Sequence, residues 1–207
     1  MQTESSQGRE IPVWLRWAAL VWLAVWFPTY WQNWGAINFL RLCDVTIILT
    51  CIGLWTSNSL LLSSQAVATI LVDCAWMLDV AWQLVFSRHL TGGTEYLWDA
   101  HHPLWVRLLS LFHVVWPVLL LWAIARVGYD RRGWILQIVI AAAVITASRW
   151  AGAELNYNYS FRDPFFHRTW GPAPVHLAVA VAFMAIVVYW PTHLVLVRFF
   201  ATPQARA

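Results

Sequence analysis

The sequence predicts an all-α polytopic membrane protein, a single domain built as a bundle of six transmembrane helices. Hydrophobic residues make up 60% of the 207 residues and charged residues only 11%, whereas a soluble domain carries about 25% charged residues. The apolar residues fall into long runs of roughly 20 residues, the length that crosses a hydrocarbon core about 30 Å thick. So few charges cannot cover a water-facing surface, which excludes an ordinary soluble domain.

The hydropathy pattern places the six spans and their connections. The first run contains Phe27, Tyr30 and Trp31 where a signal peptide would have small residues, so we expect a retained helix. Between the runs, "WQNWG" predicts a turn, "TSNSLLLSSQ" a short polar link and "GYDRRG" a compact charged turn. The predicted spans run over about 12–31, 36–56, 64–87, 103–127, 133–152 and 174–199.

The charges indicate an orientation and exclude one class of partner. Thirteen basic and ten acidic residues give a net charge of +3. The basic residues form no continuous run, so we expect no nucleic-acid partner. With both termini in the cytoplasm, that side would hold seven arginines and the other side six. The short loop "YDRR" carries most of the positive-inside signal. We therefore predict a protein of the bacterial plasma (inner) membrane with both termini cytoplasmic.

Ionisable residues inside the predicted spans are the main functional signal. Counting about 1.5 Å per residue from the face with the long loops places Asp44 and Asp79 about 12 Å deep and His113 about 15 Å deep, with Asp73 at about 21 Å. Such groups normally face inward and pair. A carboxylate on one ring nitrogen fixes the histidine tautomer and leaves the other nitrogen as a base. We expect His113, Asp44 and Asp79 to be catalytic; the alternative is a structural network between helices.

Four further residues are candidates for binding a substrate. Arg41 and Arg107 lie above the polar layer, about 8 Å and 6 Å deep, where guanidinium groups would meet an anionic head group. Trp76 lies in mid-span, either as the wall of a cavity or in tight packing. Glu95 belongs to the long loop "SRHLTGGTEYLWDAHHP". This loop and "AELNYNYSFRDPFFHRTWGPAP" fall on one face, as a lid over a site or as an interfacial aromatic belt.

No metal or cofactor is expected from the histidines. The run "DAHH" offers Asp99, His101 and His102, but adjacent histidines do not converge on one ion without further ligands. His113 has no second histidine at its depth, which argues against a haem held by two histidines.

Two segments resemble a known family. "FLRLCDVTIILTCIGLW" and "HPLWVRLLSLFHVVWPVLLL" are similar to the androgen-induced-gene family of multi-spanning membrane lipid hydrolases, which use an intramembrane threonine and histidine. Phe39, Leu40 and Asp44 match the family pattern. His113 stands four residues before a proline, where the family has five, and Arg41 occupies the threonine position. The resemblance implies a similar helical fold and cleavage of a lipid ester, without naming the nucleophile.

Taken with the polar layer, this predicts a pocket that handles a lipid or acyl-ester substrate entering from the bilayer. Hydrolysis or acyl transfer is the expected reaction, with His113 as general base and water as the candidate nucleophile. The alternative is a non-catalytic subunit of a membrane complex, or a small transporter, whose tryptophan-rich faces pack against partner subunits or membrane lipids.

Overall fold

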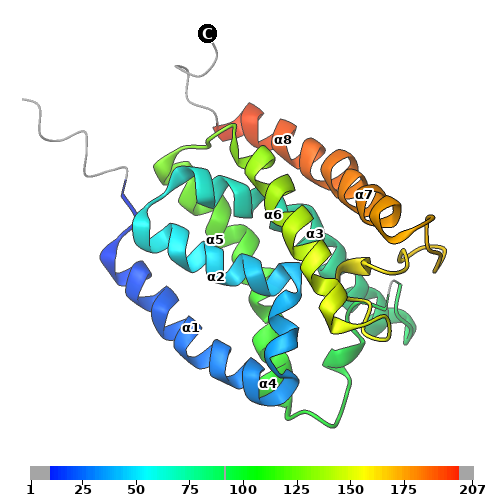
Figure 1. Cartoon of the computed structure of the whole chain (residues 1–207). Helices are drawn as coiled ribbons and strands as arrows, with labels where there is room; N and C mark the ends of the chain where they lie inside the picture. The colour runs from blue at the N-terminus through cyan, green and yellow to red at the C-terminus, as the bar shows by residue number, and fades with distance from the viewer. Residues whose placement is uncertain (1–9, 91, 201–207) are drawn as a thin grey trace, which may run out of the picture.

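The computed structural model describes residues 10–90 and 92–200, and within these residues the chain forms helices and loops with no strand. The α-helices, shown in Figure 1, are α1 (Val13–Trp34), α2 (Leu42–Thr56), α3 (Ser59–Phe86), α4 (Leu104–Leu108), α5 (Phe112–Val127), α6 (Gly133–Ala147), α7 (Ala173–Phe183) and α8 (Trp190–Phe200). Short helical turns adjoin them: η1 (Ala36–Leu40), η2 (Glu95–Leu97), η3 (Leu109–Leu111), η4 (Ser148–Ala151), η5 (Tyr157–Tyr159) and the π-helical η6 (Met184–Tyr189).

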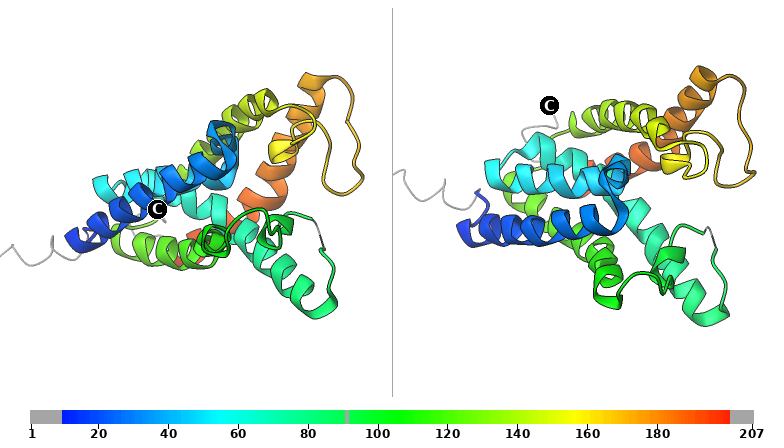
Figure 2. Two further views of the ribbon diagram at one scale, coloured as in Figure 1. Left: turned by 90° about the horizontal axis from the view of Figure 1, so that it is seen from below. Right: turned by 60° about the horizontal axis from the view of Figure 1, so that its bottom comes forward.

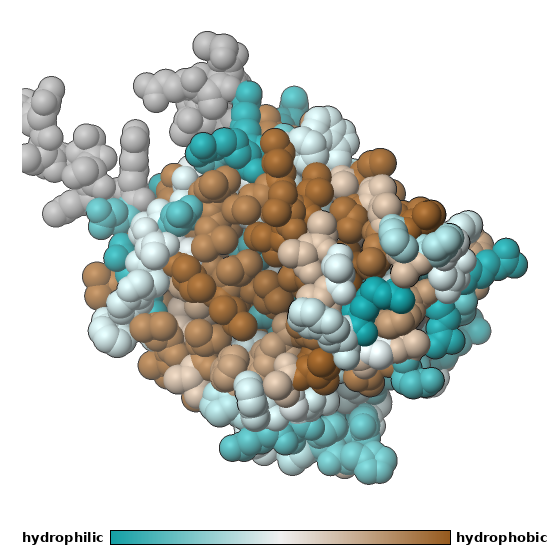
Figure 3. All heavy atoms as spheres, viewed as in Figure 1, coloured by the Kyte–Doolittle hydropathy of each residue, from teal (hydrophilic) through white to brown (hydrophobic). Residues whose placement is uncertain are grey.

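The all-helical fold class is confirmed, and every predicted span is helical over most of its length. Four helical segments are long and apolar enough to cross a membrane: Ser59–Phe86, Leu104–Val127, Gly133–Ala151 and Ala173–Phe200. Helix α1 has 22 residues and α2 is a shorter apolar helix of 15. Figure 3 shows an apolar surface in the middle of the molecule with hydrophilic side chains gathered toward its ends. This distribution is the one that an integral membrane protein needs.

The predicted polar link "TSNSLLLSSQ" is wrong for most of its length, because α3 already begins at Ser59. The turn consists of Ser57, in the left-handed conformation with φ 51°, and Asn58. The Asn58 side chain accepts a hydrogen bond of 2.9 Å from the Leu61 N–H, which caps the helix. Serines favour loops in water, but inside a helical bundle their small size allows close packing.

Helix α3 is the centre of the bundle and packs against α2, α5 and α6. It comes close to α6 at Gly133, where an added Cβ would lie 2.7 Å from Cβ of Ser63 and 2.9 Å from its backbone carbon. Next to this crossing, the Ser64 hydroxyl donates a hydrogen bond of 2.9 Å to Oε1 of the buried Gln137. Small residues therefore set the α3–α6 distance.

The two ends of the bundle differ. At one end, Arg16 Nη2 donates to Ser57 Oγ at 2.9 Å and joins the start of α1 to the α2–α3 turn. The backbone N–H of Asp130 donates to Ser63 Oγ at 2.9 Å and joins the α5–α6 turn to the same region. Figure 2 shows the long segments 87–90, 92–103 and 152–172 at the other end, where the helices diverge.

Two spans are interrupted. Helix α4 passes into α5 through the 3₁₀ turn η3, and α7 passes into α8 through the π-helical η6. Only 11% of the apolar window in Ala173–Phe200 is buried inside the molecule, against 50% for Ser59–Phe86. The α7–α8 segment therefore faces outward over most of its surface.

Candidate functional site

The imidazole of His113 is held in a fixed orientation between α3 and α5. Its Nδ1 lies 2.7 Å from Oδ1 of Asp73, and both residues are buried, with 5% and 1% of their surface exposed. Trp76, one turn further along α3, stacks on the imidazole with ring centroids 4.7 Å apart. A carboxylate only accepts hydrogen bonds, so Nδ1 carries the hydrogen and Nε2 is left as an acceptor.

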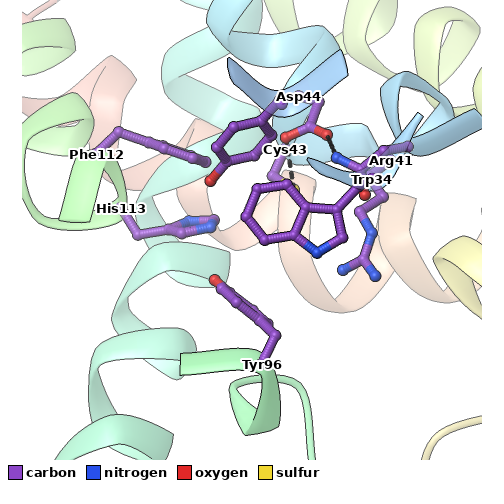
Figure 4. A pocket seen from close by; sticks show the side chains of 9 residues that line it. Trp34, Arg41, Cys43, Asp44, Tyr96, Phe112 and His113 are labelled. Atoms are coloured by element: carbon purple, nitrogen blue, oxygen red, sulfur yellow. Dashed lines mark hydrogen bonds between the residues drawn. The ribbon is translucent and has the colours of Figure 1, made fainter. Parts of the chain in front are cut away.

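A small cavity of about 40 Å³, lined by polar and aromatic side chains, adjoins this histidine. Since about 10–15 Å³ of such space holds one water molecule, the cavity has room for a few waters. Figure 4 shows the imidazole of His113 and the hydroxyl of Tyr96 directed toward the same space. The lining residues come from α1, η1, α2, η2 and α5 and from the junction of η1 and α2: Tyr30, Trp34, Asn38, Arg41, Cys43, Asp44, Tyr96, Phe112 and His113.

Asp44 brings a second carboxylate to the cavity. It is 2% exposed, and its Oδ2 accepts a hydrogen bond of 2.6 Å from the side-chain amide of Asn38. The Cys43 thiol donates to its Oδ1 at 3.8 Å. The structure thus places Asp44 and His113, two of the three predicted catalytic residues, around one cavity.

Arg41 brings a positive charge to the cavity. Its guanidinium lies over the ring of Tyr157, 4.4 Å from the centroid. Nε is buried without a hydrogen-bond partner, and among residues 10–90 and 92–200 no carboxylate oxygen lies within the 4.0 Å of an ion pair. A guanidinium in this position is able to bind an anionic group.

Tyr96 is a cavity residue that the sequence reasoning missed. It lies in η2, within the long loop after α3, and its hydroxyl accepts a hydrogen bond of 3.0 Å from Trp76 Nε1. Burial raises the pKa of Tyr96 to about 12, so the phenol keeps its proton and remains a hydrogen-bond donor at neutral pH. The aromatic content of this loop was the only available signal.

Asp79 belongs to a different site, so the predicted layer of Asp44, Asp79 and His113 is wrong. Its Oδ1 accepts the backbone N–H of Leu90 at 2.7 Å, and its Oδ2 accepts the hydroxyl of Thr94. This carboxylate fastens the following loop to the end of α3. The partner of His113 is instead Asp73. Asp73 and Asp79 are six residues apart in α3, a rise of about 9 Å along the helix.

The error has a physical cause. Counting residues gives depth only when helices stand parallel and start at one plane, whereas here the helices diverge toward the loop end (Figure 2). The span containing His113 also begins with the separate helix α4 and the turn η3.

Of the other predicted binding residues, one contacts His113 and two lie outside the cavity. Trp76 stacks on His113 and so forms part of the site. Arg107 does not line the cavity: its Nη1 donates to the carbonyl of Leu97 at 2.7 Å and so supports η2, which carries Tyr96. Glu95 is exposed in the same turn.

The second long loop also reaches the site. The Asn158 side chain donates to the carbonyl of Leu40 at 2.7 Å and accepts from the N–H of Leu42 at 2.9 Å. These bonds fasten the loop to the start of α2 and hold Tyr157 against Arg41. Both long loops therefore contribute contacts at or beside the cavity.

The "DAHH" run forms a local pair. His101 Nδ1 lies 2.6 Å from Asp99 Oδ1 at the surface, while the ring of His102 packs on Trp34 with centroids 4.7 Å apart. Within the described ranges, no group of three or more His, Cys, Asp or Glu side chains is arranged to hold a metal ion.

Comparison of the chain with protein-family models, with curated proteins and with solved structures gives no match. The chemistry of the cavity is therefore the basis for assigning a function.

Proposed function

We propose that this protein is an intramembrane hydrolase of lipid or acyl-ester substrates, with His113 as general base. The observation that carries the proposal is the environment of the imidazole: Nδ1 is bound to Asp73 at 2.7 Å, and the ring borders a cavity of about 40 Å³. A histidine oriented by a buried carboxylate beside a space for water is the arrangement that general-base catalysis requires.

The reaction follows from this arrangement. Nε2 of His113 takes a proton from a water molecule, whose oxygen attacks the acyl carbon and forms a tetrahedral oxyanion. The hydroxyl of Tyr96 donates a hydrogen bond to that oxyanion, the kind of donor that stabilises such intermediates. The protonated imidazole then returns its proton to the leaving alkoxide, giving a carboxylic acid and an alcohol. Asp44 accepts a hydrogen bond from the attacking water and orients it.

Water is favoured over a side-chain nucleophile because of what lines the cavity. Arg41 stands where the resemblance would require threonine, and the lining contains no serine or threonine. Thr46 and Thr50 are buried deeper in α2 and do not reach the cavity. The Cys43 thiol already donates a hydrogen bond to the Asp44 carboxylate. Space for a few waters supplies the remaining nucleophile.

The surroundings favour a lipid substrate. The outer surface is apolar, so an acyl chain would approach through the bilayer, and Arg41 would bind a carboxylate or phosphate near the ester. A cavity of about 40 Å³ admits the ester group but not an acyl chain. The acyl chain would therefore remain outside the cavity, with the ester group beside His113 and Tyr96.

A second candidate is a non-catalytic subunit of a membrane complex or a small transporter. It is favoured by the α7–α8 segment, because only 11% of its apolar window is buried inside the molecule. Such an outward face suits contact with a partner helix as well as with lipid. In that case the His113–Asp73 pair would hold α3 against α5 or carry a proton.

The test is turnover of a panel of acyl esters by the purified protein, comparing wild type with His113→Ala. His101→Ala is the matched control, because that side chain is 93% exposed and lies outside the cavity. Size-exclusion chromatography and thermal unfolding establish that each variant is folded. We expect turnover by wild type and the control and none by His113→Ala. Equal turnover by His113→Ala, or none by folded wild type across the panel, contradicts the proposal.

A further inference from the structure

The end of the bundle opposite the cavity carries an excess of positive charge. Arg126 lies in the last turn of α5, Arg131 in the α5–α6 turn and Arg198 in the last turn of α8. Within residues 10–90 and 92–200 none of the three forms an ion pair. Arg126 instead lies over the ring of Trp122, 4.9 Å from its centroid.

The described acidic residues at this end are already engaged. Glu10 pairs with Arg16 at 3.7 Å, and Asp130 with Arg132 at 2.8 Å. Neither carboxylate is therefore available to neutralise Arg131 or Arg198. The two arginines lack a counter-charge from the described part of the chain.

Arg131 and Arg198 line one open hollow of about 720 Å³, together with Leu194, Val197 and Phe199 from α8. Leu194 and Phe199 are 51% and 72% exposed, so the apolar wall is open to the surroundings. A charged rim and an apolar wall therefore meet at the end of a helix long enough to cross a membrane.

We propose that this hollow binds the head group of an anionic phospholipid. The two guanidinium groups would bind the phosphodiester, and an acyl chain would lie along the outward face of α8 beside Leu194. Basic groups close to a membrane surface attract anionic lipids, and arginine forms bidentate hydrogen bonds to phosphate oxygens.

The exposed apolar side chains beside the two arginines favour a lipid over a free anion. Three of its five lining residues are apolar; inorganic phosphate would leave them in contact with water, whereas a phospholipid would cover them. Its place at the end of the last span puts it at the level of the head groups. This site is separate from the His113 cavity and does not depend on the hydrolase proposal.

The experiment measures lipids retained by the purified full chain with native mass spectrometry. The protein is exchanged into mixed micelles containing equal amounts of phosphatidylglycerol and phosphatidylcholine. The test variant is Arg131→Gln with Arg198→Gln. The control is Arg88→Gln with Arg168→Gln, two exposed arginines at the loop end whose replacement makes the same change in charge. Thermal unfolding confirms that both double variants are folded.

We expect wild type and the control to retain phosphatidylglycerol over phosphatidylcholine, with a preference that weakens as salt is added. In the Arg131/Arg198 variant, the ratio of retained phosphatidylglycerol to phosphatidylcholine should fall roughly tenfold to thirtyfold, about the effect of two surface arginines.

Three results would overturn the proposal. These are equal retention by the Arg131/Arg198 variant, an equal loss in the control, and full competition by millimolar inorganic phosphate. The last result would identify a site for free anions.

Discussion

The His113 imidazole and the Asp73 carboxylate meet between α5 and α3 with Nδ1 and Oδ1 2.7 Å apart, although 40 residues separate them in the sequence. The other carboxylate oxygen, Oδ2, is buried with no hydrogen-bond partner among the described residues. Among those residues, the His113 imidazole is therefore the main hydrogen-bond partner of the Asp73 carboxylate. The proposed role of His113 as general base rests on this pairing.

Tyr96→Phe tests the proposed donor to the oxyanion. Removing the hydroxyl leaves the ring but takes away a hydrogen bond that forms in the transition state, so we expect kcat for ester hydrolysis to fall roughly tenfold to a hundredfold with little change in KM. Tyr159→Phe, in the other long loop and outside the cavity, is the control. An unchanged kcat in Tyr96→Phe would remove this residue from the mechanism.

The pH dependence gives an independent check on Tyr96. Burial raises its pKa to about 12, above the ordinary value of 10.0. The phenol therefore stays protonated as the pH rises through 10 and loses its proton only near 12. In the wild type, we expect no loss of rate from this group between pH 9 and about 11. A fall in kcat in that interval that disappears in Tyr96→Phe would contradict this assignment.

Arg41→Gln tests recognition of the substrate. Since the guanidinium has no carboxylate partner within ion-pair distance in the described part of the chain, its removal should act on an anionic ligand. We expect KM to rise roughly tenfold for esters with a neighbouring carboxylate or phosphate, with kcat nearly unchanged. Uncharged esters of equal chain length serve as the internal control, and an equal effect on both substrate classes would argue against head-group binding.

Two glycines give a matched test of the fold. In Gly133→Ala the new Cβ would lie 2.7 Å from Ser63 Cβ and 2.9 Å from its backbone, so the α3–α6 crossing must open. We expect a loss of about 1–3 kcal/mol in the free energy of unfolding. In Gly53→Ala the nearest atoms, at 3.0 Å, belong to the flexible side chain of Leu62, so the loss should be smaller. Thermal unfolding in detergent ranks the two, and the reverse order would contradict the packing described.

Asp79→Ala tests the separation of the two carboxylate sites. It leaves the buried hydroxyl of Thr94 and the N–H of Leu90 without this acceptor, at a cost of about 1–3 kcal/mol. We expect faster hydrogen exchange at Leu90 and a lower unfolding temperature, with the His113–Asp73 pair retained. Thr94→Val, which removes one of these bonds, should have a smaller effect. Unchanged exchange at Leu90 in Asp79→Ala would mean that this carboxylate does not hold the loop.

Hydropathy was sufficient to predict where the helices lie, because each run of apolar residues became helical over most of its length. Four of these helical segments are long and apolar enough to cross a membrane. Hydropathy failed at 59–63, because small polar residues such as Ser63 indicate a loop in water but allow a close helix crossing in this bundle. It also identified His113 as unusual, because a polar ring in an apolar run needs a partner.

Counting residues along the helices could not identify the carboxylate that pairs with His113. Choosing Asp73 over Asp79 required the tilt of α3 and the break between α4 and α5, which are set by packing between distant segments. Tyr96 was missed for a related reason: a loop has no periodicity from which to infer which side chain turns inward.

A double-mutant cycle on His113 and Asp73 tests the central claim most directly. Ester hydrolysis in ¹⁸O-labelled water would be followed for wild type, Asp73→Asn, His113→Ala and the double variant, each shown to be folded. We expect ¹⁸O in the acid product and a kcat for Asp73→Asn reduced roughly a hundredfold or more. The double variant should be no slower than His113→Ala, because the carboxylate acts only through the imidazole. Full activity of Asp73→Asn, or effects that multiply in the double variant, would contradict the account.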